Sequence, residues 1–201
     1  LLGSNTSIGI TKSFGLGAIG FSDVFSDLKP DILVLLGDRF EALSAACAAL
    51  FANIPIAHIH GGEITKGSWD DSIRHSITKM AHLHFVASST YEKRVLQLGE
   101  KPQNVFTFGG LGVDAITNTI FSGRNEIENL LNFKFLHKNL LITFHPLTLC
   151  SENQNNDFEE LLKSLSKLDD VGMIFTNPNA DKGSKEICCL IDQFCRKTKN
   201  A

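Results

Sequence analysis

The stretch "DILVLLGD" (31–38) is a continuous apolar run that ends in Gly-Asp, a pattern typical of a parallel strand buried on both faces. Residues 39–54 follow with apolar side chains at helical spacing and many alanines, which favours a helix packed closely on a sheet. The alternation then continues with strands predicted at 54–60, 84–88 and 104–110, and helices at 70–83 and 89–100. Strands and helices that alternate through short connections predict an α/β fold with a doubly wound parallel sheet.

A second alternation starts after a polar stretch, with strands predicted at 139–146 and 171–179 and helices at 156–168 and 184–197. We therefore predict a first domain at 1–121, a linker at 122–138 and a second domain at 139–201. Two strand–helix units are too few for a stable open sheet, so we expect the second domain to be incomplete at Ala201. The chain begins at Leu1 instead of Met, and we expect it to be a piece of a longer protein.

The composition bounds the class of protein. Of 201 residues, 43% are hydrophobic and the formal net charge is −3, which predicts a packed core without bulk attraction to nucleic acid or anionic membranes. No apolar run reaches membrane-spanning length. The five cysteines form no C-x-x-C pair, which disfavours a disulfide framework or a zinc ribbon. We interpret them as reduced, mostly buried thiols of a cytoplasmic protein.

Polar side chains and glycines gather where the predicted strands end. Asp38 ends the first strand, His58 to Glu63 end the second, and Gly109 and Gly110 end the fourth. In doubly wound sheets the ligand crevice lies beyond the carboxyl ends of the strands. The sequence therefore places these residues at the functional edge of the sheet.

Two readings of this edge compete with acid–base chemistry. His58 and His60, with His75 or Asp71, could hold a metal, but a core histidine bonded to backbone is the simpler account of His58, and we predict no metal. The "HGG" (60–62) and "FGG" (108–110) stretches fit neither the dinucleotide fingerprint nor the P-loop. Their glycines either approach an anion through backbone N–H groups or serve tight turns with positive φ.

The acidic pair in "WDDSIRH" (69–75) opens a predicted helix, where a carboxylate caps well and favours the helix dipole. Arg74 lies four residues after Asp70, so the two are expected to bridge on one helix face. Where several carboxylates crowd at one edge, their repulsion raises the pKa of one of them. Near neutral pH one member can then act as an acid and another as a base. In the second domain, His145 ends a strand and could meet the same substrate, or could be a plain loop histidine. Asn177 and Asn179 end another strand, where a turn and helix cap is the alternative.

These residues resemble a known family. The blocks that carry the resemblance are 28–88, which includes "GDR", "HGGE" and "DDSIRH", then "RVLQLGEKPQNVFTFGGLGVDAI" (94–116), "LLITFHP" (140–146) and "NPNADKGSKEI" (177–187). Together they are similar to the hydrolysing UDP-N-acetylglucosamine 2-epimerases of sialic acid-type sugar synthesis. The resemblance implies a GT-B-like pair of Rossmann-type domains, both incomplete here, with a UDP-sugar bound between them. It also implies a homo-oligomer, dimer or tetramer, that needs neither NAD nor a metal.

The family's reaction starts when a base removes the proton at C2 of the sugar while UDP leaves from C1. Water then adds to the glycal, and the products are UDP and a free sugar with inverted C2. The residues expected to carry out the acid–base work are Asp38, Glu63, Asp70, Asp71 and His145. Those expected to hold the substrate are His60, Gly61, Gly62, Arg74, His75, Arg39, Gly109, Gly110, Asn177 and Asn179.

Two positions depart from relatives that act on plain UDP-N-acetylglucosamine. Leu36 replaces a histidine, and His60 stands where a catalytic glutamate is expected, with Glu63 nearby. The same departures resemble the branch that feeds legionaminic acid synthesis, whose substrate is UDP-N,N'-diacetylbacillosamine, and we favour that substrate over UDP-N-acetylglucosamine. The alternatives are a non-hydrolysing epimerase, a nucleotide-sugar-binding or oligomerisation module without activity, and a metal hydrolase.

Overall fold

The computed structural model describes residues 6–145, 154–179 and 183–201, and the chain divides into two compact units, Leu1–Thr119 and Ile120–Ala201. The first unit holds a four-stranded sheet in the order β1-β2-β3-β4, with every pair parallel. The predicted parallel α/β architecture is therefore confirmed. Its strands are β1 (Leu33–Leu36), β2 (Ile56–Ile59), β3 (Leu83–Val86) and β4 (Val105–Thr107).

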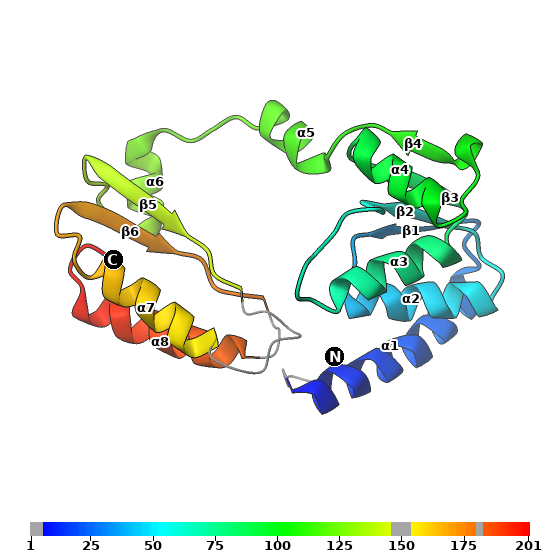
Figure 1. Ribbon diagram of the computed structural model, residues 1–201, viewed down its shortest axis with the longest axis horizontal. Coiled ribbons are helices and arrows are strands. Elements are labelled where there is room, and N and C mark those ends of the chain that lie inside the picture. The colour runs from blue at the N-terminus through cyan, green and yellow to red at the C-terminus, as the bar shows by residue number, and fades with distance from the viewer. Residues whose placement is uncertain (1–5, 146–153, 180–182) are drawn as a thin grey trace. The chain divides into compact units, whose positions relative to one another are not determined.

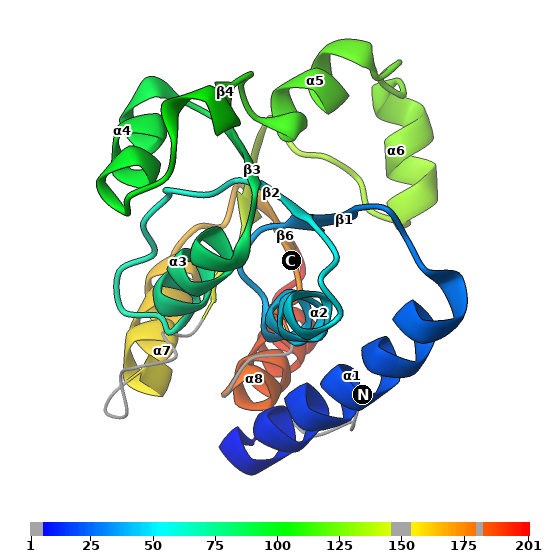
Figure 2. The same ribbon diagram turned by 90° about the vertical axis from the view of Figure 1, so that its right-hand side faces the viewer.

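Helices connect these strands and cover one face of the sheet. Ala46 on α2 (Phe40–Phe51) and Ile77 on α3 (Asp70–Met80) join the buried cluster with Leu35 and Ile56, and α2 and α3 lie side by side in Figure 2. Val95 on α4 (Ser89–Gln97) packs with β3 and β4. A short 3-10 turn (Pro102–Asn104) and α5 (Leu111–Asn118) flank β4.

The opposite face of the sheet corrects one expectation. Residues 31–38 were predicted to form a strand buried on both faces, yet Val34 and Leu36 are 59% and 56% exposed. Side chains alternate across a strand, so these two point away from the buried Leu35. The rings of Phe85, Phe106 and Phe108 stack on one another at 5.4–6.2 Å, and Phe108 is exposed. Because α2, α3 and α4 pack on the other side, these helices leave this apolar surface uncovered.

Helix α1 (Ser7–Leu28) was not predicted from the sequence. Its glycines lower helix propensity, but tertiary packing supplies the stability. Phe21 and Phe25 pack on the buried cluster of α2, and Figure 1 shows α1 beyond α2 as seen from the sheet. Gly17 fits a close approach, since a Cβ there would lie 3.0 Å from Ser44 Oγ. The Thr6 side chain caps the helix by accepting a hydrogen bond from the Gly9 backbone N–H at 3.1 Å.

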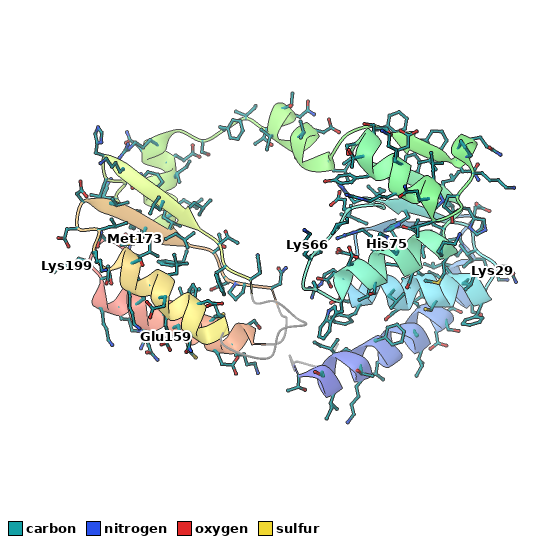
Figure 3. All side chains as sticks on the ribbon, in the orientation of Figure 1. Lys29, Lys66, His75, Glu159, Met173 and Lys199 are labelled. Atoms are coloured by element: carbon teal, nitrogen blue, oxygen red, sulfur yellow. The ribbon has the colours of Figure 1, made fainter. Side chains whose placement is uncertain are left out.

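In the second unit the described residues form one parallel strand pair, β5 (Lys138–Ile142) and β6 (Val171–Phe175), with α7 (Gln154–Leu165) and α8 (Ser184–Lys197). Its core joins Phe158, Met173 and Ile187, and Figure 3 marks Met173 on β6. The segment proposed as a linker, 122–138, contains α6 (Arg124–Leu131). None of the helices in the described part of the chain is both long and apolar enough to span a bilayer.

The expectation of mostly buried thiols is wrong for the cysteines that the structure describes. Cys47, Cys188 and Cys195 are half-buried, and Cys189 is exposed. On α8 the buried positions are taken by Ser184, Ile187 and Ile191, and Cys195 packs at the border of this core one turn after Ile191. Cys150 lies outside the described residues.

Candidate active site

Asp38 lies just beyond β1 and is paired with Arg74 of α3. The turn that places it begins at Gly37, whose φ of +76° suits glycine. Arg74 is 5% exposed, and its Nη2 donates to the Asp38 carboxylate and, at 2.9 Å, to Thr65 Oγ1. Two further guanidinium nitrogens, Nε and Nη1, are buried without a hydrogen-bond partner. The sheet edge thus carries a buried cation whose bonded charge partner is Asp38.

The acidic pair that opens α3 splits between two environments. Asp71 Oδ1 accepts from the Thr65 backbone N–H at 3.0 Å and lies 3.7 Å from Arg74 Nη1, and its Oδ2 lies 3.7 Å from His75 Nε2. Asp70 instead accepts a hydrogen bond from Ser68 Oγ at 2.7 Å. The expected bridge between Asp70 and Arg74 is therefore wrong, because Arg74 turns inward to Asp38 and meets Asp71, three residues before it.

Neither aspartate is the N-cap of α3, because that position is taken by Trp69, whose side chain does not cap the helix. Both aspartates lie in the first turn, where a negative charge is favoured by the helix dipole. Figure 3 marks His75 on this helix and Lys66 in the loop before it. His75 is half-buried and its Nδ1 is buried without a hydrogen-bond partner.

His60 and Glu63 form a second pair at the end of β2. His60 Nδ1 lies 2.7 Å from Glu63 Oε1, and both side chains are partly exposed. His60 adopts a φ of +65°, uncommon for a residue other than glycine, while its backbone N–H donates to Phe85 O at 2.9 Å. No hydrogen bond or ion pair among the described residues joins this pair to the cluster of Asp38, Arg74 and Asp71.

Of the two predicted glycine turns, only the one at Gly61 and Gly62 is required by close packing. A Cβ at Gly61 would lie 3.1 Å from Thr78 Oγ1, and one at Gly62, whose φ is +79°, would lie 2.3 Å from Tyr91 O. Gly109 has a φ of +92° with open space around it. A Cβ at Gly110 would lie 3.6 Å from His60 Cε1, so the turn after β4 borders the end of β2. The tight-turn interpretation is thus sufficient for "HGG", and the anion interpretation stays a prediction.

His58 is fully buried in β2 and has both ring nitrogens engaged. Nε2 lies 2.7 Å from Gly37 O, and Nδ1 lies 3.1 Å from Thr78 Oγ1. The simpler reading of a core histidine bonded to backbone fits these contacts, and a metal would have to displace them. Within the described residues, no three His, Cys, Asp or Glu side chains gather as a metal site requires.

Acid should destabilise the first unit through His58. Burial lowers its pKa to about 4 from an ordinary 6.5. Between these values the unfolded chain binds a proton that the folded chain does not, so the free energy of unfolding should fall as pH drops from 6.5 to 4, by at most about 3 kcal/mol. Denaturant titrations followed by the fluorescence of Trp69 should show this loss in the wild type and not in His58→Gln. Parallel pH profiles for the two proteins would contradict it.

Of the remaining predicted residues, Arg39 is the N-cap of α2 just beyond β1, and the others lie in the second unit. Arg39 Nε lies 3.7 Å from Glu41 Oε2, and the Arg39 guanidinium stands over the Phe40 ring at 5.7 Å. In the second unit, the Asn179 backbone N–H donates to His145 Nδ1 at 3.4 Å, which brings the ends of β5 and β6 together. His145, Asn177 and Asn179 are all exposed.

Three polar partners of the site were missed by the sequence analysis: Thr65, Ser68 and Thr78. Thr78 follows Arg74 by four residues and so shares its helix face, a spacing visible in the sequence. Thr65 and Ser68 lie in the loop before α3, whose course no periodicity predicts. Their contacts depend on how that loop folds back over the first turns of α3.

The arrangement suits proton transfer beside an anion. Asp38 is a carboxylate whose charge a buried guanidinium balances, and the imidazole of His60, held by Glu63, can accept or donate a proton. Arg74 keeps a positive charge close to Asp38 and Asp71 at this edge, which favours the ionised form of both carboxylates.

The sequence and the fold are similar to those of known proteins. A family model described as UDP-N-acetylglucosamine 2-epimerase matches residues 1–200. The chain is 44% identical to a Campylobacter jejuni protein named GDP/UDP-N,N'-diacetylbacillosamine 2-epimerase (hydrolyzing), over 100% of this chain and 52% of that protein. It is 34% identical to a Legionella pneumophila protein named UDP-N,N'-diacetylbacillosamine 2-epimerase (hydrolyzing), over 92% of this chain and 48% of that protein.

A crystal structure of Methanocaldococcus jannaschii UDP-GlcNAc 2-epimerase in complex with UDP-GlcNAc and UDP matches with a TM-score of 0.76 at 18% identity. The match covers 94% of this chain and 53% of that chain. The fold is therefore the GT-B-like α/β fold of such enzymes. The chain spans about half the length of the curated relatives it matches.

Proposed function

The chain belongs to the UDP-N-acetylglucosamine 2-epimerase family, and from this premise we propose that the complete protein is a hydrolysing nucleotide-sugar 2-epimerase. The proposed substrate is UDP-N,N'-diacetylbacillosamine, because two relatives at 44% and 34% identity carry that sugar in their names. Leu36 adds no support to this choice, since it lies on the open face of the sheet, without a described contact to Asp38.

The proposed reaction begins at C2 of the sugar. A base takes the C2 proton, the C–H electrons form a C1–C2 double bond, and the C1–O bond to UDP breaks, which gives UDP and a glycal. Water then adds its oxygen to C1, and a proton returns to C2 on the opposite face. The C2 proton is barely acidic, so the site must supply a base and stabilise the departing UDP.

The observation that carries the proposal is that two sets of side chains able to transfer protons lie at the carboxyl ends of the neighbouring strands β1 and β2. We assign base and acid work to Asp38 and Asp71, which flank Arg74, and to Glu63, which holds His60. Asp70, bonded to Ser68, stands at the margin of this group. His145, Asn177 and Asn179 are proposed to contact the substrate from the second unit. The proposed cytoplasmic location rests on the cysteine pattern, and the proposed homo-oligomer, dimer or tetramer, rests on the family alone.

Deuterated water tests the proposal. The complete protein is incubated in it with UDP-N,N'-diacetylbacillosamine, its GDP form and UDP-N-acetylglucosamine in separate reactions. The free C2-inverted sugar should appear with deuterium at C2 and one nucleoside diphosphate per sugar, fastest for UDP-N,N'-diacetylbacillosamine. Nucleotide release without deuterium would mean simple hydrolysis, and a nucleotide-linked epimer without free sugar would mean a non-hydrolysing epimerase. Either result would overturn the proposal.

A further inference from the structure

The buried contacts of His58 and Thr78 tie the two halves of the Asp38–Arg74 pair together. Both residues are fully buried, His58 on β2 and Thr78 on α3. A carbonyl oxygen only accepts hydrogen bonds, so the contact with Gly37 O requires the proton of the neutral ring on Nε2. Nδ1 is then left as an acceptor for the Thr78 hydroxyl, 3.1 Å away.

On one side this chain of contacts reaches Asp38. The carbonyl held by His58 belongs to Gly37, the residue immediately before Asp38, in a turn whose positive φ fixes where the carboxylate emerges. A shift of this turn would move Asp38 directly, because the Gly37 carbonyl belongs to the peptide bond that links the two residues.

On the other side the contacts reach Arg74. Thr78 Oγ1 lies 3.0 Å from Arg74 O, one turn earlier on α3, and the Arg74 guanidinium returns to Asp38. These contacts, called the circuit below, run through β1, β2 and α3, with Thr78 shared between two acceptors. The single hydroxyl proton of Thr78 serves either Arg74 O or His58 Nδ1 at any moment. Gly61 packs on both partners, since a Cβ there would lie 3.1 Å from Thr78 Oγ1 and 3.3 Å from His58 Nδ1.

We infer that His58 and Thr78 are positioning residues, which set the Asp38 carboxylate and the Arg74 guanidinium at the distance and angle that proton removal needs. Their role in turnover rests on the proposed function, whereas the circuit itself does not. Neither side chain needs to touch the substrate. The low pKa of His58 agrees with this role, because a ring that stays neutral keeps Nδ1 free to accept.

The test in the complete protein uses Thr78→Val, which removes the hydroxyl at nearly constant volume. We expect kcat to fall on the order of tenfold or more with little change in KM, since a small misplacement of a reacting group is costly. Thr78→Ser should restore most of kcat. The matched control is Thr117→Val on α5, where the same kind of hydroxyl bonds to the carbonyl four residues earlier but is exposed. It should behave as wild type.

NMR of the 201-residue chain supplies a readout that does not depend on any substrate. The wild type should show His58 as the Nε2–H tautomer, and Thr78→Val should shift the guanidinium signals of Arg74, while Thr117→Val should not. Unchanged Arg74 signals, or a kcat equal to that of wild type in Thr78→Val, would overturn the inference. If the complete protein turns over none of the sugars, the proposed function fails. The NMR result alone then decides whether His58 and Thr78 position Arg74.

Discussion

Asp38→Asn in the complete protein is expected to lower kcat about 10³-fold, within the range that a general acid or base contributes. Asparagine keeps the shape of the side chain and an oxygen acceptor for Arg74, but it cannot accept the C2 proton. The measurement is UDP release, together with deuterium uptake at C2, at saturating substrate. Both rates should fall together if Asp38 acts in proton removal.

Stability must be followed in parallel, because Arg74 is 5% exposed and would lose its bonded charge partner. Removing one member of a buried ion pair typically costs about 3–5 kcal/mol, somewhat less here because Asp38 is partly exposed. Asp31→Asn is the matched control, since Asp31 is exposed just before β1, and it should retain wild-type kcat and stability. An Asp38→Asn enzyme that stays folded and keeps more than a tenth of wild-type kcat would contradict the role of Asp38.

Gly62→Ala is expected to destabilise the first unit by about 3 kcal/mol or more, as positive φ and overpacking act together. The added Cβ would lie 2.3 Å from Tyr91 O, a backbone atom of α4. Helix α4 cannot retreat freely, because Val95 is fully buried against Val86 and Val105. Arg94 also donates to Gly62 O at 3.2 Å, so a shift would break this bond as well. Urea titrations followed by Trp69 fluorescence measure the loss.

Gly109→Ala separates the two causes. Gly109 also has a positive φ, +92°, but nothing lies within 4 Å of the Cβ that alanine would add. It should cost only about 1–2 kcal/mol, the usual penalty for a left-handed conformation. The difference between the two variants then reports the clash with α4. Equal losses would mean that the loop at Gly62 relaxes, and the packing explanation would be wrong.

Most of the first sheet could be predicted because its signals are local. Apolar runs such as residues 31–38 and 54–60, followed by helical spacing, identify strand–helix units without knowledge of the rest. Helix α1 escaped prediction because Gly15, Gly17 and Gly20 interrupt its apolar pattern, and its stability comes from packing on α2. The exposure of one face of β1 was not predicted either. The sequence of a strand shows which residues are apolar, but it does not show whether other elements cover both of its faces.

The sequence predicted at which edge of the sheet the site lies. It did not predict which side chains pair with one another there. Topology alone brings Asp38 and His60 to the carboxyl ends of neighbouring parallel strands. Which carboxylate Arg74 meets depends on the direction of its side chain, and helical spacing pointed to Asp70 where the structure has Asp38 and Asp71. The contact between His60 and Glu63 depends on the turn at positive φ, which is a tertiary feature.

The open side of the first sheet has a practical consequence for handling the 201-residue chain. The exposed side chains of Val34, Leu36 and Phe108 can bind an apolar dye such as ANS. Through the same apolar surface, copies of the chain can aggregate. Purified alone, the chain should need dilute conditions, mild detergent or a chaperone to stay dispersed. Lysine at Val34 and Leu36 should raise its solubility and dim the dye while leaving the Asp38–Arg74 edge intact.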